Sequence, residues 1–220
     1  MKLTVDSIKN LEQKIFPNIN FLENGTSNSK DSTDDYPWAF FSPHFYAENP
    51  AILTKDLVKK LQNKGELLSL GSGLAYLEQF LVKAYNVPVK NITLCDISAD
   101  YIPENFDFFK FNMNKEWPQF SKKFDYIIFP ESIFFCSVPL EETGDNYKRN
   151  ASMFTHIMNE SLMRLKPDGE IRMKGMTPSL DMIESVINQL QIKTGPLKYK
   201  YESGPMLKTY LSVKLNKNNL

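Results

Sequence analysis

Two glycines mark the point where a short apolar run turns into a helical pattern, in the stretch LLSLGSGLAYLEQFL. Leu67–Leu70 precedes Gly71 and Gly73, and apolar residues then recur at helical spacing from Leu74 onward. A strand that passes through a tight turn into a helix is the building block of parallel sheets. This stretch therefore predicts an α/β fold.

The rest of the chain continues this alternation of strands and helices. Further strands are expected at Asn91–Ser98, Phe106–Asn112, Phe124–Ser132 and Glu170–Lys174, and helices within Ala51–Gly65, Asn150–Leu165 and 177–190. Two alternating runs, Leu197–Ser203 and Leu207–Leu215, predict an antiparallel hairpin. The expected fold class is α/β: a single doubly wound, mostly parallel seven-stranded sheet with helices on both faces and a C-terminal antiparallel hairpin.

Individual residues mark where these helices end and which face is buried. Gly65 is expected to cap the C-terminus of the helix that precedes it. Thr177 is expected to be an N-cap with Pro178 at the first helical position. The buried face of that last helix is expected to carry Leu180, Ile183, Ile187 and Leu190.

The first fifty residues differ in composition from the rest. Leu3–Phe21 predicts a short helix, and Glu23–Asp35 is small, polar and acidic, as expected of a flexible loop. Tyr36–Pro50 is rich in aromatic residues and broken by three prolines, which excludes a regular central element. We interpret residues 1–50 as a helical and aromatic-rich cover segment and residues 51–220 as the main domain.

The charge balance and the cysteine content limit the classes of function. Lysine plus arginine and aspartate plus glutamate both number 26, so the basic excess typical of nucleic-acid-binding proteins is missing. Cys95 and Cys136 show no metal-ligand spacing, and we expect no metal site and a reducing, cytoplasmic setting. No apolar run approaches the ~20 residues that span a bilayer, and no signal peptide is apparent, so no membrane association is expected.

An acidic residue, Asp96, stands at the end of the second predicted strand, 25 residues beyond Gly71. In a doubly wound sheet, ligands bind beyond the carboxyl ends of the strands. Glycines let a ligand approach the backbone at a helix N-terminus, and a carboxylate there can accept hydrogen bonds from both ribose hydroxyls of an adenosine. Gly71, Gly73 and Asp96 are therefore predicted to bind a cofactor; a structural turn and a solvated strand end are the alternatives.

The order of the motifs resembles the class I S-adenosylmethionine-dependent methyltransferases, from about Ala51 to the C-terminus. LLSLGSGLAYLE is similar to their first motif, ITLCDIS to the second, FKFNMNKEWP to the third and KFDYIIFPESIFF to the fourth. LMRLKPDGEIRMKG is similar to the run that precedes their fifth strand. The resemblance implies a Rossmann-like fold and S-adenosylmethionine (SAM) as the cofactor.

The resemblance also implies a set of binding residues. The glycine loop of the family lies under the methionine part of the cofactor, the acid binds the ribose, the third motif flanks the adenine and the fourth strand points toward cofactor and substrate. In this chain the implied cofactor-binding residues are Gly71, Ser72, Gly73, Leu74, Asp96, Ile97, Asn112, Met113 and Pro130.

Three positions depart from the family pattern. Ser69 stands where the family has an acidic residue that helps to hold the amino group of the cofactor, so its loss could weaken binding or shift the anchor elsewhere. Asn112 replaces a frequent aspartate, although its side-chain oxygen can still accept a hydrogen bond. The sequence FPES lacks the Asp/Asn-Pro-Pro-Tyr run of enzymes that methylate amino groups of nucleic acid and glutamine.

An NAD-dependent oxidoreductase is the nearest alternative on the same physical grounds. Its glycine motif would place the third glycine at position 76, which is Tyr76. In the methyltransferase pattern the third place is Ala75, a residue of little bulk. The pattern therefore favours the methyltransferase.

We expect a SAM-dependent methyltransferase that acts on a small molecule, with a protein acceptor left open and the oligomeric state undetermined. Much of the catalysis can come from alignment and desolvation, so no strict catalytic residue follows. If the acceptor must lose a proton, Glu131 and His44 are the candidate bases; a surface carboxylate and a packed histidine are the alternative interpretations. Two other functions stay open: a different transfer from SAM, as in nicotianamine synthase-like enzymes, and a non-catalytic methyltransferase-like binding module, which Ser69 would suit.

Overall fold

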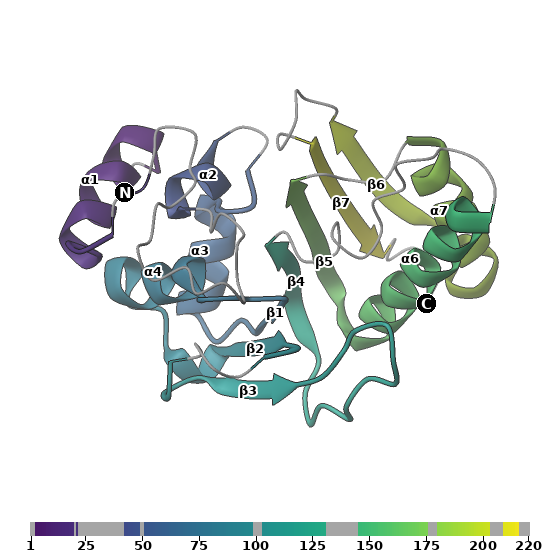
Figure 1. Ribbon diagram of the computed structural model, residues 1–220, viewed down its shortest axis with the longest axis horizontal. Coiled ribbons are helices and arrows are strands. Elements are labelled where there is room, and N and C mark those ends of the chain that lie inside the picture. Colours follow the sequence, from purple (N-terminus) through teal and green to yellow (C-terminus); the bar gives the residue numbers. More distant parts are fainter. Residues whose placement is uncertain are drawn as a thin grey trace.

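The computed structural model describes residues 3–19, 21, 42–48, 51–98, 103–130, 145–175, 180–202 and 209–215. The strands are β1 (Leu67–Leu70), β2 (Ile92–Asp96), β3 (Asp107–Lys110), β4 (Phe124–Pro130), β5 (Leu165–Gly175), β6 (Leu197–Glu202) and β7 (Thr209–Leu215). Within the described residues they form a seven-stranded sheet of order β3-β2-β1-β4-β5-β7-β6 (Figure 1).

The strand pairing confirms the predicted fold class. β1 pairs in parallel with both β2 and β4, β2 pairs in parallel with β3, and β4 with β5. β7 lies antiparallel between β5 and β6, which confirms the C-terminal hairpin. Because the strand order runs outward in both directions from β1, the loops at the carboxyl ends of β1 and β4 diverge. The predicted ligand position lies at this reversal.

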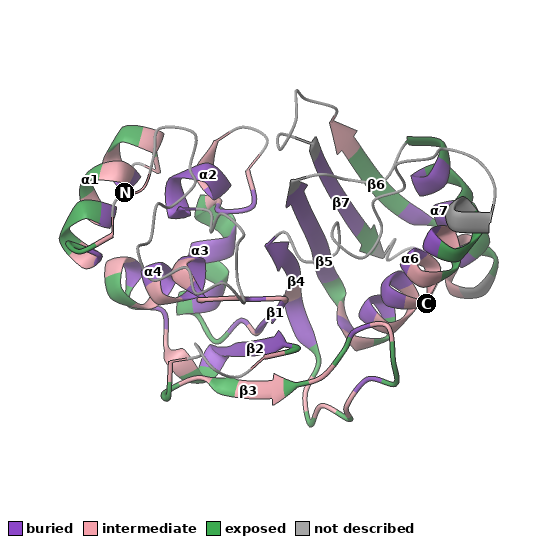
Figure 2. Ribbon diagram, viewed as in Figure 1, coloured by how far each residue is buried: buried purple, intermediate pink, exposed green. Residues whose placement is uncertain are grey.

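Helices cover both faces of the sheet. In Figure 1, one layer lies to the left of the strands, namely α1 (Val5–Ile15), α2 (Pro43–Ala47), α3 (Lys55–Gln62) and α4 (Tyr76–Tyr85). The layer on the right contains α6 (Asp145–Arg164) and α7 (Leu180–Thr194). Each layer has its own apolar cluster against the sheet, and β1, β2 and β4 are buried along almost their whole length (Figure 2). This burial on both faces explains why these strands read as continuous apolar runs.

α3 ends at Gln62 with Asn63 as its C-cap, so the predicted glycine cap at Gly65 is wrong. Lys64 has a φ of 64°, the left-handed position that follows the helix. The N–H of Gly65 donates to the carbonyl of Lys60 at 2.8 Å, and a Cβ on Gly65 would lie 2.6 Å from that oxygen. A glycine is therefore needed at position 65, because a larger residue would collide with α3. The strained left-handed conformation is adopted by Lys64 instead.

Replacing Lys64 with glycine is expected to raise the free energy of unfolding by about 0.5–1 kcal/mol, because glycine adopts the left-handed conformation without a steric penalty. Lys59→Gly is the matched control at an exposed helical position of α3, where glycine is expected to cost about 1 kcal/mol. Urea unfolding of both variants measures whether the free energy of unfolding rises in Lys64→Gly and falls in Lys59→Gly. A destabilised Lys64→Gly protein would contradict the strain at this position.

Two other expectations differ from the structure. The stretch KPDG, expected as a turn before the fifth strand, lies inside β5 and interrupts the regular register with β4. Leu180, expected on the buried face of α7, is 40% exposed, because it is the first residue of the helix. Ile183, Ile187 and Leu190 are buried as predicted.

The N-terminal helix packs beside the start of α4. α1 confirms the predicted helix, and the Thr4 side chain caps it by accepting the N–H of Ser7 at 3.3 Å. Phe16 and Phe21 contact the ring of Tyr76 edge-on, at centroid distances of 5.3 and 5.5 Å. Phe16, which caps α1, and Phe21 therefore lie next to the first turn of α4.

A buried lysine fixes α2 to the sheet. Lys174 of β5 is fully buried, and its ammonium donates to the carbonyl of Phe45 and, at 2.8 Å, to that of Glu48. The same ammonium lies 4.6 Å from the centre of the Phe45 ring. α2 is thus the described part of the predicted aromatic cover, and it is anchored at its C-terminal end.

Several expectations fall outside the described residues. They concern the polar loop Glu23–Asp35, the aromatic residues 36–41, Cys136 and the helix start at Thr177 and Pro178. The division into a cover segment (1–50) and a main domain (51–220) stays a prediction. None of the helices in the described part of the chain is both long and apolar enough to cross a membrane.

Candidate functional site

The elbow between β1 and α4 contains three residues in the left-handed backbone conformation. Gly71, Gly73 and Ala75 have φ values of 68°, 51° and 54°. Glycine adopts this conformation without steric cost, whereas alanine pays about 1–2 kcal/mol. The alternation winds the chain into the tight turn that the two glycines predicted.

Hydrogen bonds join this elbow to the end of β2. The backbone N–H groups of Gly71 and Ser72 both donate to the carbonyl of Cys95, at 2.7 and 3.1 Å. The N–H of Gly73 donates to Oδ2 of Asp96 at 2.9 Å. The predicted glycines and the predicted acid are therefore direct neighbours.

The carboxylate of Asp96 is held in a fixed orientation at the carboxyl end of β2. It is 9% exposed, and its Oδ1 accepts the N–H of Ser98 at 3.2 Å, while Oδ2 accepts that of Gly73. A carboxylate offers about four acceptor positions, which is the chemistry that binding of ribose hydroxyls requires. The geometry suits the role predicted for Asp96.

The end of β3 lies next to this acid. The N–H of Phe111 donates to the carbonyl of Asp96 at 3.0 Å, which places Asn112 close by. Asn112 is exposed, and its side-chain oxygen accepts the N–H of Asn114 at 2.9 Å. Ile97 is 63% exposed and forms an apolar surface directly after the acid. Contacts of Ile97 and Asn112 with an adenine stay predictions.

The other implied binding residues are less exposed. The side chain of Met113 is buried in the core, and its carbonyl accepts the indole N–H of Trp117 at 2.8 Å. Leu74 is partly buried and belongs to the elbow, and Pro130 is buried at the end of β4. Roles of these three residues in cofactor binding also stay predictions.

A buried acid that the sequence analysis did not single out lies beneath the elbow. Glu78 of α4 is 1% exposed, and its Oε1 accepts a hydrogen bond from the hydroxyl of Ser69 on β1. Burial raises the pKa of Glu78 to about 7, against the opposing effect of hydrogen bonds from Ser69 and from its own backbone. The signal was present, because Glu78 lies four residues after Leu74 and three before Leu81, on the apolar stripe of the helix.

The elbow also carries a polar group without a partner. The hydroxyl of Ser72 is buried and makes no hydrogen bond in the described structure. A buried hydroxyl of this kind calls for a partner from water or a ligand. The orphaned hydroxyl, the glycine backbone and the Asp96 carboxylate together fit the polar groups of SAM.

The two candidate bases differ in what the structure describes. His44 is buried on α2, and its Nδ1 lies 2.7 Å from Oε2 of Glu12 and 2.7 Å from the hydroxyl of Ser42. Its Nε2 is buried and has no hydrogen-bond partner among the described residues. These contacts correspond to the packed, hydrogen-bonded alternative, and a catalytic role for His44 stays a prediction. Glu131 lies outside the described residues.

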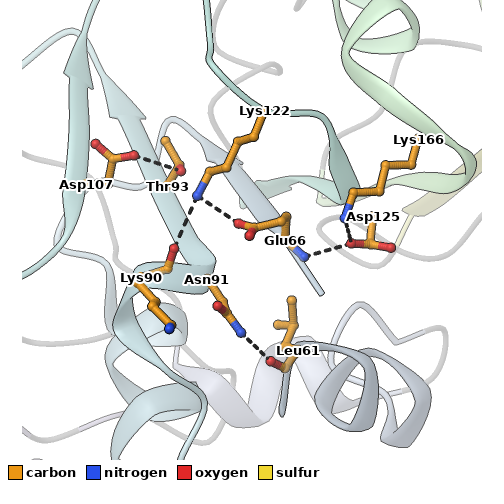
Figure 3. Close-up of polar contacts among 9 residues, drawn as sticks. All are labelled: Leu61, Glu66, Lys90, Asn91, Thr93, Asp107, Lys122, Asp125 and Lys166. Atoms are coloured by element: carbon orange, nitrogen blue, oxygen red, sulfur yellow. Dashed lines mark hydrogen bonds and ion pairs between the residues drawn. The ribbon is translucent and has the colours of Figure 1, made fainter. Parts of the chain in front are cut away.

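Charged contacts gather at the opposite, amino end of the strands (Figure 3). Asp125 of β4 accepts the N–H of Glu66 at 2.8 Å and pairs with Lys166 at 2.6 Å. Burial would raise the pKa of Asp125, but the hydrogen bonds from Lys166 and Glu66 outweigh it and hold the pKa below its usual value. Lys122 bridges Glu66 and the carbonyl of Lys90 at 2.7 and 3.2 Å. These contacts stabilise the edge of the sheet that faces away from the elbow.

A cavity of about 590 Å³ lies elsewhere, on the face of β5, β7 and β6 beside the start of α3. It is lined by polar and charged groups that include Glu170, Lys198 and Lys214, and by none of the elbow residues. Glu170 is buried beside it, where it accepts hydrogen bonds from Arg172 at 2.7 Å and from Ser212 at 2.5 Å. This polar face is a separate feature from the cofactor-type elbow.

The comparisons with known proteins concern the fold. No protein-family model and no curated protein matches the sequence. DesVI of Streptomyces venezuelae is similar in structure, with a TM-score of 0.50 and 10% identity over 73% of this chain and 88% of that chain. A SAM-dependent methyltransferase from Clostridium acetobutylicum gives a TM-score of 0.49 and 11% identity over 73% of this chain and 89% of that chain. With its strand order and antiparallel end, the protein has the class I methyltransferase-like, Rossmann-like fold.

Proposed function

We propose that this protein is a SAM-dependent methyltransferase that acts on a small-molecule acceptor. The observation that supports the proposal is the hydrogen bond from Gly73 to Asp96, at 2.9 Å, which joins the glycine elbow to the acid at the end of β2. The buried, unpartnered hydroxyl of Ser72 supports a polar ligand at the same position. Ser69 replaces the acidic residue of the family pattern, but the carboxyl group of Glu78 lies next to that serine and could take the place of the missing acid.

The residues of the chain would act mainly by alignment. Gly71 and Gly73 let the ligand approach the backbone, and Asp96 orients the ribose. When bound, SAM supplies a methyl group that is bonded to a positively charged sulfur. The sulfur is a good leaving group, because it takes the electron pair of the broken bond and becomes neutral. The acceptor contributes the lone pair that forms the new bond, and it must release a proton if it began neutral and protonated.

Two observations support a small-molecule acceptor: the net charge of the chain and the position of α2 in the cover segment. The formal net charge is zero, which argues against a nucleic-acid acceptor. α2, with Phe45 and Tyr46 buried, is fixed next to the carboxyl half of β5 by Lys174, near the edge of the sheet where an acceptor would enter. The cytoplasmic setting belongs to the same proposal, and the buried free thiol of Cys95 supports it.

Calorimetric titration of the purified protein with SAM, S-adenosylhomocysteine (SAH) and NAD tests the proposal. Micromolar binding of SAM and SAH without binding of NAD is the expected result. Binding of NAD alone would favour the oxidoreductase, and no binding of any of the three would favour a module that acts through other partners. Product analysis with SAM labelled in the methyl group then separates methyl transfer from transfer of the aminocarboxypropyl group.

A further inference from the structure

The carboxyl group of Glu78 is held by the two elements that the elbow joins, α4 and β1. Glu78 is the third residue of α4, and its hydrogen-bond partner Ser69 lies two residues before Gly71 on β1. Both side chains are buried, so the acid is enclosed between the strand and the first turn of the helix. The acid therefore lies between the two elements that the elbow joins.

This acid has no cationic partner among the residues that the structure describes. The printed stretch from Leu67 to Leu81 contains neither lysine nor arginine. Helices α1 and α2, which pack against α4, bring the buried Glu12 and His44, but these two pair with one another at 2.7 Å. The charged residues of α3 are exposed, and the acid of the adjoining β2 is Asp96. Among the residues that the structure describes, a negative charge on Glu78 therefore has no neighbouring cation to compensate it.

The proposed reaction changes the charge of the ligand. SAM carries a sulfonium group, whereas SAH carries a neutral thioether and is otherwise the same molecule. A carboxylate in a low-dielectric environment attracts a nearby positive charge over several ångströms, and the attraction is much weaker in water. An ionised carboxyl beneath the elbow thus favours the substrate form of the ligand over the product form.

We propose that Glu78 is a specificity-determining residue that makes the site prefer SAM over SAH through the charge of its buried carboxylate. The inference rests on the proposed function and deepens it. Loss of the methyl group removes the positive charge that compensates Glu78, so the product is held less tightly than the substrate. Glu78 would act through the charge and not through contact with the reacting atoms.

The protonation behaviour of Glu78 supports this role. Because burial raises its pKa to about 7, the carboxyl is mostly neutral at pH 6 and mostly ionised above pH 7.5. A cation at the elbow lowers this pKa, so SAM binding releases a proton near neutral pH. SAH releases less, because it lacks the sulfonium charge. The ratio of the two affinities should therefore increase with pH.

The experiment is calorimetric titration of the full-length protein with SAM and with SAH at pH 6.0 and 7.5, in two buffers of different ionisation enthalpy. In the wild type, the ratio of SAM affinity to SAH affinity is expected to rise about threefold or more between the two pH values. SAM binding at pH 6.0 is expected to release a larger fraction of a proton than SAH binding. In Glu78→Gln the ratio should not change with pH, and the difference in proton release should disappear.

Ser69→Ala is the second variant, and it keeps the carboxyl group. Ser69 lowers the pKa of Glu78 by donating a hydrogen bond, so its removal should move the rise in the affinity ratio to higher pH. A rise of equal size in Glu78→Gln would overturn the inference, because the titration would then belong to Asp96 or to the amino group of the ligand. A wild-type ratio that stays constant with pH would also overturn it. Failure of both ligands to bind at either pH would instead overturn the proposed function.

Discussion

Asp96→Ala is expected to lower the affinity for both SAM and SAH by at least about 100-fold, because it removes two hydrogen bonds to a charged acceptor at about 1.5–3 kcal/mol each. The variant also deprives the N–H of Gly73 of its partner at 2.9 Å, which loosens the elbow under the ligand. Both ligands share the ribose, so both affinities should fall by a similar factor. Calorimetric titration measures the two values.

Two control variants separate the site from the fold in this experiment. Asp107→Ala removes an exposed carboxylate of β3 that accepts a hydrogen bond from Thr93, and the affinity for SAM should stay at the wild-type value. Asp96→Asn keeps an oxygen for the N–H of Gly73 but loses the charge, and an intermediate affinity is expected. Wild-type affinity in a folded Asp96→Ala protein, verified by its thermal unfolding, would remove Asp96 from the site.

Arg172→Met is expected to lower the free energy of unfolding by about 3 kcal/mol, because it leaves the buried carboxylate of Glu170 without its main partner. Arg172 donates to Glu170 at 2.7 Å, to the carbonyl of Ile52 at 2.9 Å and to the hydroxyl of Thr54 at 2.9 Å. Burial would raise the pKa of Glu170, but the hydrogen bond and the charge of Arg172 outweigh it and hold the pKa below its usual value. The stabilisation is therefore present at neutral pH and lost as the pH falls through the acidic range.

The double variant Glu170→Gln, Arg172→Met tests the cause of this loss. It removes both charges, so it should be more stable than Arg172→Met alone. Lys214→Met removes the other cation of Glu170, which is 52% exposed and 3.2 Å away, and is expected to cost at most about 1 kcal/mol. Denaturant unfolding of the three proteins gives the comparison. If Arg172→Met and Lys214→Met lower the free energy of unfolding equally, burial of the Glu170–Arg172 pair does not increase its contribution to stability.

The sequence was sufficient for the sheet because its central strands are buried on both faces. β1 matches its predicted range, and the other predicted strands contain the observed ones, apart from β5, which begins five residues earlier. Its early start depends on pairing between Phe124 and Leu165, a contact between distant residues that no local pattern reports. The same holds for the end of α3, where the approach of Gly65 to Lys60 decides which residue takes the left-handed conformation.

The candidate site was predictable where its chemistry is local. Gly71, Gly73 and Asp96 follow from glycine conformation and strand ends, and the structure brings them together. The sequence did not identify Glu78 as a site residue, although it lies on the apolar stripe of α4. An acid at such a position shows a role only when its hydrogen-bond partner is known. That partner, Ser69, is nine residues away in the sequence, and only the fold brings the two side chains together.

The clamp between Lys174 and α2 has a consequence for how the molecule opens. Two carbonyl groups at the end of α2 are bound to an ammonium that lies inside the sheet, so α2 cannot separate without uncovering a buried cation. The amide hydrogens of Phe45 and Tyr46 should therefore exchange with solvent in the same large openings as those of β5, and not by local fraying. We therefore expect this short helix to unfold together with the sheet, although it precedes every strand of the sheet in the sequence.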